Sequence, residues 1–303
     1  MAATAAACGG DSAESVTPGS QPTPSGTLRI AVPRGPHSLD PLLATSEVER
    51  LVVAQVYEPL TREVSGPYGH GASQSGLALW ARPGPGGTIW RVRLRPGLRF
   101  SDGARFNAAA VLANATRWRT TAAGQELLPG LTAADAPAPD LVRFIFDRPV
   151  TDLGRRLESV QLGIVSPRSL RAPDATNRLA AGLAAGTGPF EIHQAEAREV
   201  LLARNADWWG TRHQLGPGVD LIVLRFPQAP SRRLALLERG SVQVAEGLGS
   251  DELAAVRRDS LLTAQSRQGE GVGLSREVRG FSGAEGTPQL SRTWLTTVGG
   301  GEG

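Results

Sequence analysis

The most informative segment of the sequence is Trp90-Arg-Val-Arg-Leu-Arg-Pro-Gly-Leu-Arg-Phe-Ser-Asp-Gly-Ala-Arg-Phe-Asn107. Apolar side chains alternate partly with arginines from Ile89 to Arg95, which predicts a strand with one buried and one solvent-exposed face. Pro96-Gly97 predicts the end of this strand. A second turn is predicted at Asp102-Gly103, where Asp can bond its own backbone and Gly can adopt a positive φ.

Asn107 is then placed to cap a helix that extends to Trp118. This succession resembles the signature region of extracellular solute-binding protein family 5, the oligopeptide, dipeptide and nickel receptors of ABC importers. Members carry the pattern Trp-x-Phe-x-Leu-Arg-x-Gly-x-x-Phe-x-Asp-Gly-x-x-Phe, with Val92 here replacing the first Phe. The residues that match in register are Trp90, Leu94, Arg95, Gly97, Phe100, Asp102, Gly103 and Phe106. In this family the motif identifies the fold rather than the ligand contacts.

A pentapeptide further along the chain matches the same family without substitution. It consists of Gly186, Thr187, Gly188, Pro189 and Phe190. Because glycine permits backbone angles that other residues resist and proline fixes the next turn, we expect a backbone device first and part of a cleft rim second. The resemblance extends from about Gly26 to Leu262.

Local patterns predict the remaining elements. Strands are expected at 27–32, 141–146, 160–165, 190–193, 199–204, 219–226 and 242–245. Helix N-caps are expected at Ser46, Ser231 and Ser250. The segment 68–87 is rich in Pro and Gly and predicts a loop.

Composition is that of an ordinary globular protein, with 40% apolar and 20% charged residues. The 32 basic and 29 acidic residues leave a net charge of +3, and every basic residue except the histidines is Arg. The arginines are scattered without aromatic interleaving, which favours solvated faces over a phosphate-binding patch. We therefore expect no nucleic-acid partner.

Cys8 is the single cysteine, so no intrachain disulfide and no cysteine-built metal site is expected. Ala5-Ala6-Ala7 precede it and a Ser, Thr, Pro and Gly-rich tether follows, which resembles a lipoprotein cleavage site. Only seven residues stand before Cys8, fewer than a secretory signal needs. Either the start has been placed too late or Cys8 is an ordinary residue of a tail; the lipid anchor is the preferred prediction. Residues 1–25 are thus expected to be a signal remnant and tether, and the anchor the sole membrane contact.

Catalysis is not indicated. The histidines His37, His70, His193 and His213 have neither the spacing of a zinc site nor a partner nucleophile in a Gly-x-Ser-x-Gly elbow. Gly186 and Gly188 lack the rest of a dinucleotide fingerprint. We expect no enzyme activity, no metal and no cofactor.

The family resemblance implies an α/β fold of the type II periplasmic-binding-protein class. It implies a first lobe from residues 26–50 plus 184–262 and an inserted subdomain at 51–183. A second ligand-binding lobe is expected to be missing. Residues 263–303 are rich in glycine and are expected to be disordered or of non-native sequence.

The implied function is that of a substrate-binding lipoprotein of an ABC importer, outside the cytoplasm, capturing peptides or similar small solutes. Its partners would be that solute and the permease and ATPase complex. Candidate ligand-binding residues are Arg34, His37, Ser38, Asp40 and Thr187, each with loop solvation or turn capping as the alternative. A truncated, non-transporting relic or a surface interaction fragment is the alternative function.

Overall fold

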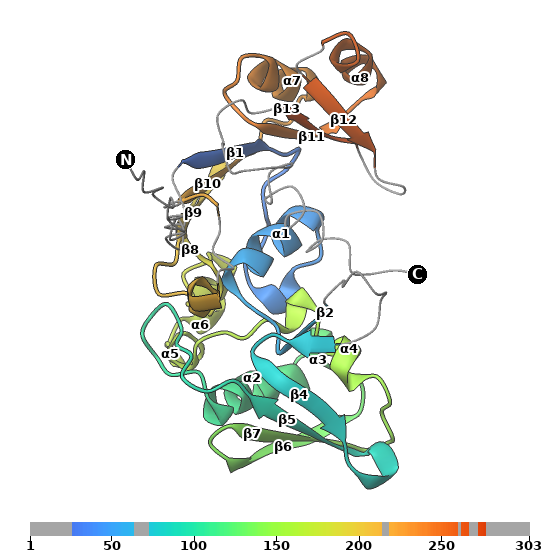
Figure 1. Ribbon diagram of the computed structural model, residues 1–303, viewed down its shortest axis with the longest axis vertical. Helices are drawn as coiled ribbons and strands as arrows, with labels where there is room; N and C mark the ends of the chain where they lie inside the picture. Colours follow the sequence, from blue (N-terminus) through green and yellow to red (C-terminus); the bar gives the residue numbers. More distant parts are fainter. Residues whose placement is uncertain (1–25, 64–72, 214–217, 260–261, 267–271, 277–303) are drawn as a thin grey trace, which may run out of the picture.

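The computed structural model describes residues 26–63, 73–213, 218–259, 262–266 and 272–276. The elements spread along one long axis, with one large sheet toward one end and a smaller sheet at the other (Figure 1). Helix α1 (Glu47–Val56) lies between them.

The larger sheet has seven strands and mixes parallel and antiparallel pairs. In spatial order the strands are β12 (Leu262–Ser266), β13 (Val272–Arg276), β11 (Val244–Leu248), β1 (Thr27–Ala31), β10 (Leu221–Arg225), β9 (Glu199–Arg204) and β8 (Phe190–Ala195). The central strand β1 pairs in parallel with both β10 and β11. Helix α7 (Pro230–Glu238) connects these two neighbours, so three parallel strands end at the same edge.

The smaller sheet is antiparallel and has the order β4 (Ala78–Pro83), β5 (Ile89–Leu94), β7 (Leu141–Phe146), β6 (Leu131–Ala138). Helix α2 (Ala108–Thr120) packs against β6 and β7. A separate pair, β2 (Thr61–Glu63) and β3 (Ser73–Ser75), lies nearby.

Shorter helices complete the described chain. They are α3 (Ala122–Leu127), α4 (Leu153–Arg156), α5 (Pro167–Arg171), α6 (Ala175–Ala180) and α8 (Ser250–Val256), with 3-10 helices η1 (Pro41–Leu43), η2 (Pro85–Gly87), η3 (Val160–Leu162) and η4 (Trp209–His213). None of the helices in these ranges is long and apolar enough to cross a bilayer.

The signature segment folds as its pattern predicts. Trp90, Val92 and Leu94 are buried in one core cluster with residues of α2, while Arg91 between them is exposed. The Asp102 carboxylate accepts the Ala104 N–H at 2.9 Å, and Gly103 has φ of 77°. The predicted strand, turn and helix are therefore confirmed.

Capping expectations are confirmed at two sites and wrong at two. Asn107 accepts the N–H of Ala110, and Ser46 forms a capping box with Glu49. Helix α7 instead has Ala229 as its N-cap, and α8 has Gly249, so Ser231 and Ser250 lie inside the helices. At α8 the Glu252 side chain accepts the Gly249 N–H, which replaces a serine cap.

Three other local expectations are corrected. The apolar run 160–165 forms η3 and an irregular segment rather than a strand. The described part of 68–87 contains β3 and β4, because Ala78–Pro83 pairs along β5 despite its flanking glycines. Past 262, where disorder was expected, β12 and β13 extend the large sheet.

The glycines of the pentapeptide also act differently from expectation. Neither Gly186 nor Gly188 has a positive φ. A Cβ at Gly186 would lie 1.9 Å from the Val56 carbonyl oxygen, and one at Gly188 would lie 2.4 Å from that of Gln55. Glycine is therefore required here because two backbones approach closely at the end of α1.

Candidate functional site

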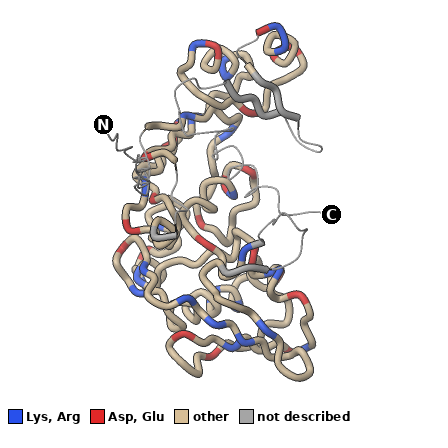
Figure 2. Tube along the Cα trace, viewed as in Figure 1, with Lys and Arg blue, Asp and Glu red and all other residues tan. Residues whose placement is uncertain are grey.

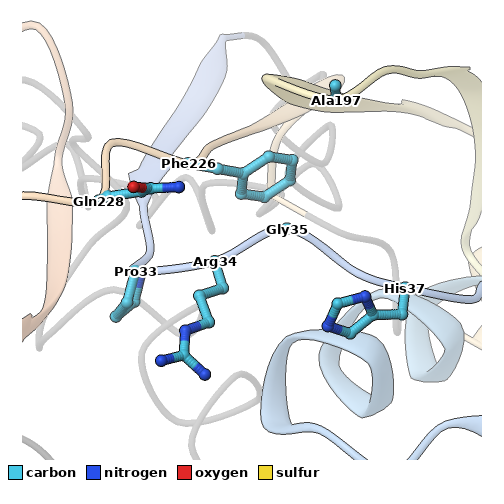
Figure 3. A pocket seen from close by; sticks show the side chains of 7 residues that line it. All are labelled: Pro33, Arg34, Gly35, His37, Ala197, Phe226 and Gln228. Atoms are coloured by element: carbon cyan, nitrogen blue, oxygen red, sulfur yellow. The ribbon is translucent and has the colours of Figure 1, made fainter.

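A hollow of about 560 Å³ lies where the parallel strands β1 and β10 end. Its lining comes from the segment after β1, the segment after β10 and the turn between β8 and β9. The lining residues are Pro33, Arg34, Gly35, His37, Ala197, Phe226 and Gln228 (Figure 3). The carboxyl edge of parallel strands is where ligands bind in open α/β sheets.

The lining combines two basic side chains with one aromatic ring. Arg34 and His37 extend to the same side of their segment, and the Phe226 ring lies on the other side, against Gly35 (Figure 3). A Cβ at Gly35 would lie 2.9 Å from a Phe226 ring carbon, so the backbone rests directly on the ring. No acidic side chain of the described residues lines the hollow, and Arg34 makes the formal charge of this lining positive.

The buried carboxylate of Glu49 fixes the segment that carries Arg34 and His37. One oxygen accepts the backbone N–H groups of His37 at 2.8 Å and Ser38 at 3.2 Å, and the other accepts those of Thr45 at 3.0 Å and Ser46 at 2.9 Å. Burial raises the pKa of Glu49, but these hydrogen bonds outweigh it and lower the pKa to about 2. The carboxylate stays ionised and holds the segment as a backbone-binding anion.

A buried cation fixes the opposite rim. The Arg233 guanidinium donates to the carbonyl oxygens of Pro227 at 2.7 Å, Gln228 at 2.6 Å and Glu246 at 2.7 Å, and also to that of Gly247. Burial lowers the pKa of Arg233, and the charge of Glu252 opposes that shift. The Gln228 wall is thus tied to the end of β11.

Three predicted ligand-binding residues lie outside this lining. The Ser38 hydroxyl accepts the Asp40 N–H at 3.2 Å. Asp40 is buried, caps η1 and forms an ion pair with Arg117 of α2. Thr187 is buried beside Glu58 at the other end of α1. The polar atoms of Ser38 and Asp40 serve turns and packing. Of the five predicted residues, Arg34 and His37 line the hollow.

Glu58 is a buried acid that the sequence analysis did not select. It accepts the Trp209 Nε1–H at 2.8 Å and lies 3.3 Å from Arg62. Burial raises its pKa, and Trp209, Arg62, Thr187 and Trp208 oppose that shift. Thr187 Oγ1 and Trp208 Nε1 nevertheless form no hydrogen bond of normal geometry within the described residues. Both are therefore weak polar neighbours of Glu58 rather than full hydrogen-bond donors.

The described residues do not meet the requirements of a metal site. Within the described ranges, no three His, Cys, Asp or Glu side chains gather as a metal site would require. Cys8 and His70 lie outside those ranges, so the expected lipid anchor is not addressed by the structure.

Relatives of known sequence point to one class of protein. Residues 39–276 match the family model described as bacterial extracellular solute-binding proteins, family 5 Middle. The glutathione-binding protein GsiB of Escherichia coli (strain K12) is 29% identical over 164 residues, which cover 52% of this chain and 31% of that protein. The chain thus spans about a third of the length of the curated relatives it matches.

Solved structures agree on the fold. The periplasmic binding protein DppA from Helicobacter pylori, in complex with the peptide STSA, has a TM-score of 0.66 at 22% identity, covering 80% of this chain and 50% of that one. The dipeptide-binding protein from Pseudoalteromonas sp. SM9913, in complex with Met-Leu, has a TM-score of 0.69 at 16% identity, covering 79% and 51%. These matches show the predicted type II periplasmic-binding-protein fold. With a family model matching most of its length, the chain belongs to the bacterial extracellular solute-binding proteins of family 5.

Proposed function

We propose that this chain is the solute-binding component of an ABC importer and that the hollow at the ends of β1 and β10 forms part of its ligand site. The supporting observation is the place of that hollow: it lies at the carboxyl edge of parallel strands, in a chain of this family. The GsiB relatives are named for binding glutathione, and two structural neighbours hold peptides. The ligand class we propose is accordingly a peptide or a similar small solute.

The lining supports a ligand that carries a carboxylate. An Arg guanidinium matches a carboxylate with two parallel N–H donors, and the imidazole of His37 adds a further donor from the same side. Phe226 provides an apolar surface, and the Gln228 amide can donate to or accept from a peptide group. A cationic group would instead meet Arg34 without a compensating acid in the lining.

The rest of the transport assignment extends this proposal. The larger sheet would form a first lobe from residues 26–50 and 184–262, and the smaller sheet an inserted subdomain at 51–183. The receptor would work outside the cytoplasm with a permease and ATPase complex, tethered through a lipid on Cys8. Metabolic labelling with a fatty-acid probe tests the tether: Cys8→Ser should abolish labelling, and equal labelling would reject a lipid at Cys8.

A direct test uses the 303-residue chain labelled with nitrogen-15 and titrated with glutathione and with Met-Leu. We expect shifts in the amide signals of Gly35, His37 and Gln228, and their loss in Arg34→Gln. The matched control is Arg257→Gln, an exposed arginine on another part of the chain. The C-terminal amide of Met-Leu should shift these signals less than the free acid. Shifts of equal size in both variants, or none near the hollow, would reject this site.

A further inference from the structure

The open face of the smaller sheet carries an unusual row of three arginines. Arg82 of β4 is directly opposite Arg91 of β5, and Arg91 is directly opposite Arg143 of β7. Residues opposite one another in antiparallel strands point to the same face. Since Trp90 and Val92 face the core shared with α2, the side chains of this row point away from the core. Figure 2 shows basic segments, in blue, along the backbone of the smaller sheet.

The fold compensates the two flanking arginines and leaves the central one uncompensated. Arg143 binds Asp135 through two hydrogen bonds of 2.7 and 2.6 Å. The Arg82 guanidinium lies 5.1 Å from the centre of the Trp80 ring. Arg91 is exposed, and within the described residues it has no acidic or aromatic partner. Like charges directly opposite in a sheet are destabilising, so an external anion would relieve a repulsion that the fold retains.

The other side chains of this face indicate which class of anion it would bind. Trp80, Ile89, Leu141 and Ile145 lie on the same face and are partly exposed. Arg93 lies there too and forms an ion pair with Asp140 at 2.8 Å. The arginines are not interleaved with aromatic residues along the sequence, but the strand register places three of them beside a tryptophan and aliphatic side chains. Such a combination is typical of surfaces that rest among lipid head groups. An acidic protein or a nucleic acid would not require those aliphatic positions. Guanidinium also pairs with phosphate oxygens through two parallel hydrogen bonds.

We propose that this face, defined by Arg82, Arg91, Arg143 and Trp80, docks on the anionic phospholipid head groups of a membrane. The contact goes beyond the proposed solute binding and does not depend on it, because the hollow lies at the edge of the other sheet. It departs from the expectation that a lipid anchor is the sole membrane contact. Docking would orient the protein with its smaller sheet toward the bilayer.

The test is co-sedimentation of the 303-residue chain with large vesicles. The chain carries Cys8→Ser, because this substitution removes any contribution of a lipid anchor. Vesicles contain either phosphatidylcholine alone or phosphatidylcholine with phosphatidylglycerol at a molar ratio of about 7 to 3. At an electrostatic contribution of about 5-fold per arginine, Arg82→Gln with Arg91→Gln should lower partitioning to the anionic vesicles about 30-fold. The matched control is Arg232→Gln with Arg239→Gln, two exposed arginines at α7 toward the other end of the molecule (Figure 1).

Support requires binding to anionic vesicles only, weakening by added salt, and a control pair that binds like the parent chain. An equal loss in both pairs would show an effect of net charge alone and overturn the proposal. Absence of vesicle binding would also overturn it. The proposal would also be overturned if the protein bound poly-glutamate or inorganic phosphate through Arg91 but did not bind vesicles. That result would instead indicate an acidic protein partner or a small-anion site.

Discussion

Helix α1 has a buried glutamate at each end, and the surroundings of the two carboxylates differ in kind. Glu49, in the first turn, accepts four backbone N–H groups, and its pKa falls to about 2. Glu58 lies two residues beyond the last turn, and burial raises its pKa because the side-chain donors around it do not offset the lost hydration. The helix dipole acts in the same sense, since it favours an anion at the N-terminus and disfavours one at the C-terminus.

The two ends of helix α1 are therefore stabilised by different interactions. At the N-terminal end an ionised group organises the segment that lines the hollow. At the C-terminal end, the Gly186–Phe190 segment packs closely against the helix and stabilises it. The ionised Glu58 carboxylate destabilises the fold at neutral pH. Four substitutions test this contrast between Glu49 and Glu58.

The largest effect is expected from Gly186→Ala, at the C-terminal end. Its Cβ would lie 1.9 Å from the Val56 carbonyl oxygen, so backbone must shift, and we expect a loss of about 3 kcal/mol or more in the free energy of unfolding. Chemical denaturation measures it. Gly86→Ala is a control, because a Cβ there meets nothing within 4 Å and only the positive φ is strained. A loss at Gly186 no larger than at Gly86 would show that packing does not hold this end.

Next comes Glu49→Gln at the N-terminal end. A native pKa of about 2 against 4.5 corresponds to ~3 kcal/mol of stability, present above pH 4.5 and lost as the pH falls through about 2. The substitution should remove about that much at pH 7 and progressively less below pH 4. Denaturation at several pH values measures the profile, with Glu126→Gln on exposed α3 as the control. A cost independent of pH would contradict the role of the ionised carboxylate.

Local sequence signals predicted one part of this contrast and missed the other. The Ser46 cap, the Asn107 cap and the Asp102-Gly103 turn depend on residues close in sequence, and they formed as predicted. The Ser46 cap is part of a capping box with Glu49, which was not predicted. The same box hides the second role of Glu49, because its bonds to His37 and Ser38 depend on where the segment after β1 returns.

Long-range placement explains the other misses. Arg34 and Phe226 share a hollow because β1 pairs in parallel with β10. Most of the chain separates these two strands in sequence. The Arg91 row depends on the register of three strands. The strand β6 was missed because its sequence, Leu-Thr-Ala-Ala-Asp-Ala-Pro-Ala, lacks β-branched alternation and is held by pairing with β7. Burial of Glu58 has no local signal at all.

A smaller effect of opposite sign is expected from Glu58→Gln. A raised native pKa means that the folded chain binds a proton more tightly than the unfolded chain, so this contribution to stability is fully present below pH 4.5 and is lost as the pH rises. Gln resembles the protonated acid. In acid, the variant should lower the free energy of unfolding by up to about 1 kcal/mol, because the Trp209 hydrogen bond is weakened. As the pH rises toward 8, the variant should become more stable relative to the parent chain. If the stability of the variant relative to the parent chain fell with rising pH, the contrast with Glu49 would be contradicted.

The smallest effect concerns Thr187, which lowers the pKa of Glu58 although its hydroxyl makes no hydrogen bond of normal geometry within the described residues. Thr187→Val keeps the shape of the side chain and removes a buried hydroxyl that makes no strong hydrogen bond. The substitution should therefore change the free energy of unfolding by less than about 0.5 kcal/mol at pH 7. The pKa of Glu58 should still rise, because one stabilising dipole is lost, and carbon-13 NMR of the Glu side chains follows that titration. Thr61→Val is the control, since its hydroxyl donates to the Gly154 carbonyl at 2.6 Å and its loss should cost about 1 kcal/mol or more. Equal costs at the two sites would show that Thr187 is a full donor to Glu58, and the C-terminal carboxylate would then be better compensated than its raised pKa implies.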